Sequence, residues 1–583
     1  MAKRIGIRAI GVAIFSALPF GTILSACSSA GGTAGSGFAS GAAAAKGGAG
    51  GSAAAGGSAA FGGSSAAGGF GALGGAGGSS GAGNPTTCDE AARSKSYVGC
   101  DFWPTVVPNN VWSLFDYAVV VANAGSQAAD VQVMLGAQQV ATDQVPPNGL
   151  KKIFLRWVPA LKGPDTDACG TATPVSSSII APGGAYHLVT SVPVSVYQFN
   201  ALEYKGAGGP GGKNWNACPG NQTCQDPNSQ NFGAQVGCFS FSNDASLLLP
   251  STAMTGNYRI SGTPGWPTAN GGISSYFAIT ATQDATTVNV KVAAPRGQVA
   301  QGGTRIPATG PGGTVTLQLG VGDVALLVSP ATSDLSGSLV QATKPVQVIH
   351  GIPCITLPIP QQAGECCCDH VEESVFPAET LGKHYFVTVP TSPGGRPVGH
   401  IVRLYGNVDG TVMTYPAGVT PPGAPTTLNA GQVVDLNVVS QNFEVSGDHE
   451  FAVSSFSLRA SSLGGNVTPL RGDPDVSAAT AVEQYRTKYV FLAPDDYDEN
   501  YVDVIMPMDA QVTIDGTAAA APTAIGSSGF GIARVRLGPG TGGAHLLNAT
   551  KPVGIQVMGY GAYTSYQYPG GSDLNLIAPP PVR

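Results

Sequence analysis

The stretch that decides the fold is Leu339-Val340-Gln341-Ala342-Thr343-Lys344-Pro345-Val346-Gln347-Val348, an extended run with a proline near its middle. Val and Thr favour strands, and a proline is permitted at the beginning of a strand, where its missing N–H breaks no ladder bond. The pattern recurs at Leu188–Val196 and Leu547–Ile555, and without the proline at Gly447–Val453. This repetition predicts a chain built from similar β units.

A second signature opens the predicted units with an apolar pair, a proline, a glycine and then a tyrosine. An incomplete copy of it lies at Tyr485–Tyr489. Together the two signatures divide the chain into four β units, over residues 88–243, 244–372, 373–479 and 480–583. The two clear copies are Leu248-Leu249-Pro250 with Gly256 and Tyr258, and Val375-Phe376-Pro377 with Gly382 and Tyr385.

Short runs rich in Val, Ile, Thr, Tyr and Phe fill residues 88–583, and Gly, Pro, Asn or Asp interrupts them about every 8–12 residues. Helical periodicity is confined to one short segment, Ala478–Tyr485. We therefore expect an all-β fold of serial antiparallel β-sandwich-like units, each of roughly 100 residues.

The N-terminus predicts export. A basic start is followed by the apolar run Ile10–Leu24 and then by Leu24-Ser25-Ala26-Cys27, which resembles the lipobox of bacterial lipoproteins. Residues 1–26 would be the signal peptide, and Cys27 would carry diacylglyceryl and acyl chains such as palmitate. Two or three chains anchor a protein durably in a membrane. The alternative is an ordinary signal peptide with a chance cysteine.

Residues 27–87 form the next predicted segment, which is almost wholly Gly, Ala and Ser with one charged residue, Lys46. Such a composition buries too little apolar surface to offset the entropy of ordering. We expect a disordered tether with a reach on the order of 40–45 Å.

Without Cys27, ten of the 11 cysteines remain, an even number that predicts structural disulfides in an exported protein. None lies after residue 368, so packing alone would hold the last third of the fold. The ten are Cys88, Cys100, Cys169, Cys218, Cys224, Cys238, Cys354, Cys366, Cys367 and Cys368.

Composition argues against a nucleic-acid partner. The 583 residues include only 28 Lys and Arg, and the formal net charge is −7. No basic stripe is present to contact phosphates. No phosphate-binding glycine loop leads into a helix, and no cofactor is expected.

At this point a family resemblance appears. Cys368-Asp369-His370-Val371-Glu372-Glu373, followed by Phe376–Lys383 with Pro377 and Gly382, resembles the N-terminal domain of IgGFc-binding proteins over about residues 185–505. The resemblance implies an extracellular, β-rich domain found in bacterial surface proteins and in a large animal mucus protein. It implies a structural role for the motif residues Asp369, His370, Glu372, Pro377 and Gly382. The antibody ligand is not carried over, because no antibody-contacting residue maps onto this chain.

Two clusters contain side chains of the kinds that bind metal ions. Cys366-Cys367-Cys368-Asp369-His370 holds ligand types that zinc prefers, but adjacent cysteines do not share one tetrahedral ion easily, and disulfides are favoured. The acidic loop with Asp495, Asp496 and Asp498 is a calcium candidate that lacks the EF-hand spacing, so a solvated loop is favoured. We predict no metal site.

The resulting hypothesis is a non-enzymatic, cell-surface lipoprotein, placed at the outer membrane and anchored by its lipid. Its β units would serve adhesion or bind an extracellular glycoprotein, polysaccharide or protein. A secreted hydrolase acting on an extracellular polymer and a passive envelope scaffold are the alternatives.

Overall fold

The computed structural model describes residues 84–229, 231–268, 272–359, 368–463, 469–538 and 543–581. These residues belong to one compact unit. The predicted signal peptide, Cys27 and nearly all of the predicted tether lie outside the described residues, as do Cys366 and Cys367. Strands dominate the described part of the chain, and the expectation of an all-β fold is confirmed.

The first eight strands form a group that we call the first strand set. Its organiser is the long strand β7, whose first half pairs with β1 and β3 and whose second half pairs with β2 and β8. β4 extends the sheet from β3, and β5 extends it from β2. The strands are β1 (Gly99–Phe102), β2 (Tyr117–Asn123), β3 (Ala129–Leu135), β4 (Gln138–Val145), β5 (Gly149–Leu155), β6 (Ile179–Ala181), β7 (Tyr186–Asn200) and β8 (Ala245–Leu248).

The second strand set repeats this pairing with the long strand split in two. β14 pairs with β9 and β11, while β15 pairs with β10 and β16. β6 of the first set joins its sheet beside β13. The strands are β9 (Asn257–Arg259), β10 (Tyr276–Ala281), β11 (Thr286–Lys291), β12 (Thr314–Leu319), β13 (Val324–Val328), β14 (Leu339–Ala342), β15 (Val346–Ile355) and β16 (Asp369–Ser374).

The third strand set follows the same scheme. β22 pairs with β17 and β19, and β23 pairs with β18 and β24. The strands are β17 (His384–Val387), β18 (His400–Gly406), β19 (Thr411–Thr414), β20 (Thr427–Leu428), β21 (Val433–Val439), β22 (Phe443–Gly447), β23 (Phe451–Phe456) and β24 (Val476–Ala478).

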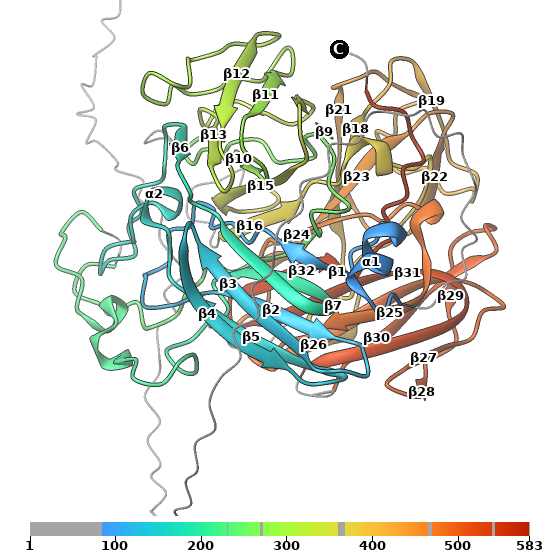
Figure 1. The fold of residues 1–583 in the computed structure, drawn as a ribbon, viewed down its shortest axis with the longest axis horizontal. Coiled ribbons are helices and arrows are strands. Elements are labelled where there is room, and N and C mark those ends of the chain that lie inside the picture. The colour runs from blue at the N-terminus through green and yellow to red at the C-terminus, as the bar shows by residue number, and fades with distance from the viewer. Residues whose placement is uncertain are drawn as a thin grey trace, which may run out of the picture. The chain divides into compact units, whose positions relative to one another are not determined.

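The fourth strand set again has one continuous organiser, β31. It pairs first with β25 and β27, then with β26 and β32. The four sets follow one another from blue to red in Figure 1. The strands are β25 (Arg486–Leu492), β26 (Glu499–Pro507), β27 (Val512–Ile514), β28 (Thr517–Ala518), β29 (Thr523–Ala524), β30 (Phe530–Arg536), β31 (Ala544–Gly561) and β32 (Thr564–Pro569).

The helices of the described residues are all short. None of them is both long and apolar enough to cross a bilayer. Ala478–Tyr485, where a short helix was expected, contains only a 3₁₀ turn. The helices are α1 (Cys88–Ser94), α2 (Pro159–Lys162) and α3 (Ala460–Leu463), and the 3₁₀ turns are η1 (Trp215–Ala217), η2 (Pro219–Asn221), η3 (Ala378–Thr380), η4 (Pro393–Gly395) and η5 (Val482–Gln484).

Pro345 directly precedes β15, as expected for a strand entered through a proline, whereas the other two prolines of the repeated pattern do not begin a strand. Pro193 and Pro552 lie inside β7 and β31, where each long strand passes from its first pair of partners to its second. Pro345 lies in the break between β14 and β15. Where the chain passes from its first pair of partner strands to its second, the missing proline N–H falls between two ladders. The proline therefore costs no hydrogen bond.

The tyrosine of the second signature bonds to a copy of the first signature. The Tyr258 hydroxyl accepts the N–H of Thr255 at 3.3 Å and donates to the carbonyl of Val346 at 2.5 Å. Tyr385 does the same with Gly382 and Phe451, at 3.1 and 2.7 Å. Tyr489 does so with Arg486 and Val553. Each such tyrosine fixes the first strand of its set on the organiser strand, which explains why the two signatures recur together.

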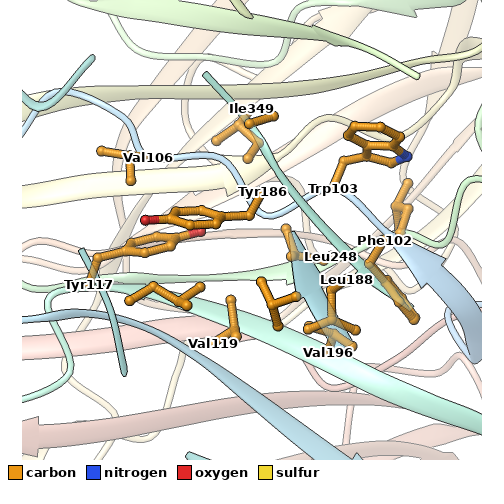
Figure 2. Packing of buried hydrophobic residues seen from close by; sticks show 14 of the residues in the cluster. Phe102, Trp103, Val106, Tyr117, Val119, Tyr186, Leu188, Val196, Leu248 and Ile349 are labelled. Carbon is orange, nitrogen blue, oxygen red and sulfur yellow. The ribbon is translucent and has the colours of Figure 1, made fainter. Parts of the chain in front are cut away.

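Hydrophobic clusters join the sets. One lies within the second set, and another lies mainly within the third. A larger cluster joins the first set to the second, and in Figure 2 Tyr117 and Tyr186 lie side by side in it, with Ile349 of β15 across from Val119 and Val196. Another joins the first set to the fourth.

The last strands of the four sets meet. β8 contacts β16, β16 contacts β24, β24 contacts β32, and β32 contacts β8, which makes a closed cycle. Whether the four predicted β units are separate domains stays a prediction.

Candidate functional site

A buried polar junction lies where the last strands of the four sets meet, and Asp244 is its hub. One carboxylate oxygen, Oδ2, accepts the backbone N–H of Glu372 at 3.0 Å and of Val476 at 3.3 Å. The other, Oδ1, accepts the N–H of Ala245 at 2.9 Å and of Gln567 at 3.3 Å. The side chain of this one residue therefore bonds to backbone in all four strand sets.

The family-motif aspartate, Asp369, holds a second part of the junction. Its Oδ1 accepts the N–H of Asn243 at 2.6 Å and of His370 at 2.8 Å. Its Oδ2 lies 2.9 Å from the hydroxyl of Thr564 and 3.3 Å from the nitrogen of Ser565. Asp369 thus connects the second set to the end of the first set and to the start of β32.

Glu372 and His370 complete the motif and are also fully buried. The Glu372 carboxylate accepts from Gln198 at 3.2 Å and from Ser246 at 3.1 Å, and it bonds the side chain of Asn200. His370 Nε2 lies 3.3 Å from Glu372 Oε2. These contacts tie β16 to β7 and β8.

Burial changes the acidity of the junction. It raises the pKa of Asp244 well above its usual value, and the nearby Asp475 carboxyl raises it further. Burial also raises the pKa of Asp369, together with the Asp473 carboxyl, and it raises the pKa of Asp475 to about 7. Carboxyl groups out of contact with water favour their neutral form.

Pro377 and Gly382 lie at the passage from the second set to the third. Pro377 caps the turn η3. A Cβ on Gly382 would fall 2.4 Å from the Cβ of Ala481 and 2.5 Å from Glu483 Oε2. Glycine is required there because the backbone approaches a neighbouring segment too closely for a side chain.

A cleft lies beside the junction and is the strongest binding-site candidate among the described residues. The second set contributes Ile273 and the disulfide-bonded Cys354 and Cys368 to its walls. The first set contributes Asn110, Val111, Trp112, Thr166, Gly170, Ala172, Val236, Phe239, Ser240, Phe241 and Ser242. It encloses about 560 Å³, including space open to solvent. Cys368 precedes Asp369 in the chain, so the family motif positions one wall of this cleft.

Disulfides hold the cleft together. Described pairs link Cys169 to Cys224, Cys218 to Cys238, and Cys354 to Cys368, and all three have a member in or next to its walls. A further pair, Cys88 with Cys100, clamps α1 to β1. The prediction of disulfide bonds is confirmed for these eight cysteines.

Two side chains set the shape of the cleft wall. Asn109 donates to the carbonyls of Asn200 and Ser242, at 2.5 and 2.9 Å, and so joins its own loop to the segments that contain these two residues. Trp112 donates its indole N–H to the carbonyl of Thr166 at 3.0 Å. A Cβ on Gly220 would fall 2.4 Å from the Trp112 ring, so glycine there leaves room for the indole.

The predicted acidic loop contacts the first set. The Lys152 ammonium lies 2.6 Å from Asp496 and also pairs with Asp495. Asp498 accepts the hydroxyl of Tyr204 at 2.8 Å and lies 3.8 Å from Arg471. Cations of the chain itself therefore offset the repulsion in this loop.

Sequence reasoning missed the cleft residues. Asn110 and Trp112 lie in one loop and Phe239 and Phe241 lie in another, and a long stretch of chain separates the two loops. One available signal was the density of Cys, Gly and aromatic residues between 215 and 241, which is typical of a cross-linked loop rather than a strand.

Comparison with known proteins identifies the family. The model for the family described as IgGFc binding protein matches residues 244–559, more than half of the chain. A Homo sapiens IgGFc-binding protein is 30% identical over 196 residues, which are 33% of this chain and 3% of the human protein. This chain thus spans a small share of that relative.

One solved structure, an anti-sigma factor domain-containing protein from Clostridium clariflavum, matches over 54% of this chain and 81% of its own. Its identity is 12% and its TM-score 0.11, so it does not bear on the fold. The family match covers the second and third strand sets and most of the fourth, together with the motif at the junction. This chain belongs to the IgGFc-binding protein family.

Proposed function

We propose that this chain is an extracellular binding protein, that a lipid on Cys27 holds it at a bacterial outer membrane, and that it presents the cleft to a ligand. The family supports binding, because the human relative is named for a binding activity. Four disulfides support an oxidising location outside the cytoplasm. The Leu24–Cys27 stretch supports the lipid anchor.

The observation that carries this proposal is the place of the cleft. The most specific family motif begins at Cys368, which lines the cleft, and continues at Asp369, which bonds to Asn243 next to the cleft wall at 239–242. The simplest interpretation of this arrangement is a ligand site beside the residues that define the family.

Binding rather than hydrolysis fits the chemistry of the walls. The cleft is lined by neutral side chains: amide, hydroxyl, aromatic, aliphatic and disulfide groups. Hydrolysis of a polymer needs paired carboxyl groups or a nucleophile with its base. The carboxyl groups of the junction are buried behind the wall.

The test has two arms. In the first, export of wild type and Cys27→Ser is followed by membrane fractionation and intact-mass analysis; we expect the wild type in the membrane with added lipid mass, and the variant released. A variant that stays membrane-bound would contradict the anchor.

In the second arm, cells that display the full chain are screened for capture of extracellular glycoproteins, polysaccharides and proteins. Phe239→Ala, in the cleft, should reduce capture, while Phe232→Ala should not. Phe232 is the matched control because it lies on the same long loop, outside the cleft lining, with 57% of its surface exposed. Equal capture by both variants would exclude the cleft as the site.

A further inference from the structure

We infer that the cleft binds one uncharged, hydroxyl-bearing ring of a glycan. This inference rests on the proposed function and names its ligand class. The cleft's charge, its aromatic walls, one unpaired amide and its size support it.

The first step is charge. The described residues that line the cleft carry no ionisable side chain. A charged ligand would lose hydration on entry and find no counter-charge in the wall, which is costly. Carboxyl groups next to the lining in the chain are engaged: Asp165 with Lys162 at 2.6 Å, and Asp167 and Asp369 with backbone N–H groups. A neutral ligand is therefore favoured.

The second step is the aromatic wall. Phe239 and Phe241 lie with ring centroids 5.1 Å apart, and Trp112 belongs to the same lining. Aromatic faces carry partial negative charge. The C–H groups on one face of a sugar ring are weakly positive, so a pyranose can stack on such a wall while its hydroxyl groups point to polar neighbours.

The third step is an unpaired donor. Asn110 lines the cleft and is 7% exposed, yet its side-chain nitrogen has no hydrogen-bond partner among the described residues. Its backbone carbonyl is engaged with the N–H of Thr166 at 3.0 Å. Buried polar groups are nearly always paired, and an orphan is unfavourable. A ligand hydroxyl that reaches this amide would remove the penalty.

The fourth step is size. The hollow of about 560 Å³ includes space open to solvent, so only part of it is enclosed. One ring of a glycan can lie against its walls while the rest of the glycan stays outside. That geometry suits recognition of polymer ends, with avidity supplied by many copies on a surface.

The experiment uses the full chain in detergent micelles on an array of neutral, acidic and sulfated glycans, followed by calorimetric titration of the best-bound glycan. We expect neutral glycans to bind. Asn110→Ala should weaken binding about tenfold, the usual effect of losing one hydrogen bond to a buried group. Phe239→Ala should weaken it by at least as much.

The controls are Gln222→Ala and Phe232→Ala, two exposed positions on the same loop outside the cleft lining. Both should bind like the wild type. Thermal melting of every variant shows whether a loss of binding reflects loss of the fold, and Phe239→Ala decides the test if Asn110→Ala is unfolded. The same glycan offered free and on a glycoprotein, with and without enzymatic deglycosylation, distinguishes the two sources.

Two outcomes would overturn the inference while leaving the proposed function intact: a preference for charged glycans, or a non-glycan ligand whose binding falls in Phe239→Ala. Neutral-glycan binding that neither Asn110→Ala nor Phe239→Ala weakens would overturn the cleft as its site. An array without any bound glycan would also overturn the inference, and the capture screen above would then decide the proposed function.

Discussion

Asp244 Oδ2 lies 3.0 Å from the backbone nitrogen of Glu372, so the carboxyl group that precedes β8 accepts a hydrogen bond from the middle of β16. The same carboxyl group also bonds to the N–H groups of Val476 and Gln567. The closed cycle of last strands therefore shares one acceptor, and the first prediction concerns its loss.

Asp244→Ala should destabilise the fold by about 3–5 kcal/mol, because several buried N–H groups lose their acceptor together. Urea unfolding of the full chain, followed by tryptophan fluorescence, measures this change. Asp509→Ala is the control, since that exposed carboxyl pairs with the exposed Lys551, and its unfolding midpoint should equal the wild-type value. Equal midpoints for all three proteins would refute the hub role.

The buried carboxyl group of Asp475 should make the stability of the fold depend on pH. Burial raises its pKa to about 7 from an ordinary value of 3.8, so the folded state binds this proton more tightly than the unfolded state. Its contribution is present at acidic pH and is lost as the pH rises from about 4 to about 7, by roughly 4 kcal/mol. The stability of Asp475→Asn should therefore fall less than that of the wild type between pH 5 and pH 8. Unfolding of both proteins at the two pH values measures the difference. Parallel profiles for the two proteins would count against it.

Tyr385→Phe tests the recurring tyrosine. The hydroxyl accepts the N–H of Gly382 and donates to the carbonyl of Phe451, and its loss leaves both buried groups unpaired. We expect a loss of about 1–3 kcal/mol in the free energy of unfolding. Tyr415→Phe should cost less, because that half-buried hydroxyl makes one bond, to the Pro425 carbonyl. A larger effect of the control would contradict the assignment.

Gly382→Ala should be poorly tolerated. The added methyl would fall 2.4 Å from the Cβ of Ala481, so the two segments must move apart, at a cost of about 1–3 kcal/mol. Gly538→Ala has no positive φ, and no atom of the described residues lies within 4 Å of the new methyl, so its melting temperature should match the wild type. Hydrogen exchange near residues 378–385 would locate the effect, and unchanged exchange in Gly382→Ala would exclude it.

Paired removal of Cys218 and Cys238, as serines, should reduce both stability and ligand capture. The bond spans a sequence separation of 20 and fixes a cleft wall, and a cross-link of this length contributes about 3 kcal/mol. Removing Cys88 and Cys100 instead should reduce stability but leave capture unchanged, because α1 does not line the cleft. Loss of capture in both double variants would point to general unfolding.

Much of the strand pattern could be predicted, because it is local. The repeated runs around Leu188, Leu339 and Leu547 are strands in the structure, since β-branched residues and turn-forming punctuation act over a few neighbours. The partners of the cysteines could not be predicted. The ten outside the lipobox allow many pairings, and only the folded loops bring Cys169 near Cys224.

The cleft could not be predicted from the sequence, for a related reason. Its walls combine residues near 110, 170 and 240, and their proximity depends on hydrogen bonds of Asn109 and Trp112 and on disulfides between the loops. The orphan amide of Asn110 becomes visible only when its burial and its neighbours are known.

The sequence by itself determined the β class, the recurring proline and tyrosine signatures, and the motif that places the chain in its family. Only the tertiary structure decided that the last strands of four sets close on Asp244. The physical reason is that its partners at Glu372, Val476 and Gln567 are backbone N–H groups. Every residue but proline has such a group, so no choice of amino acid marks where the hub will bond.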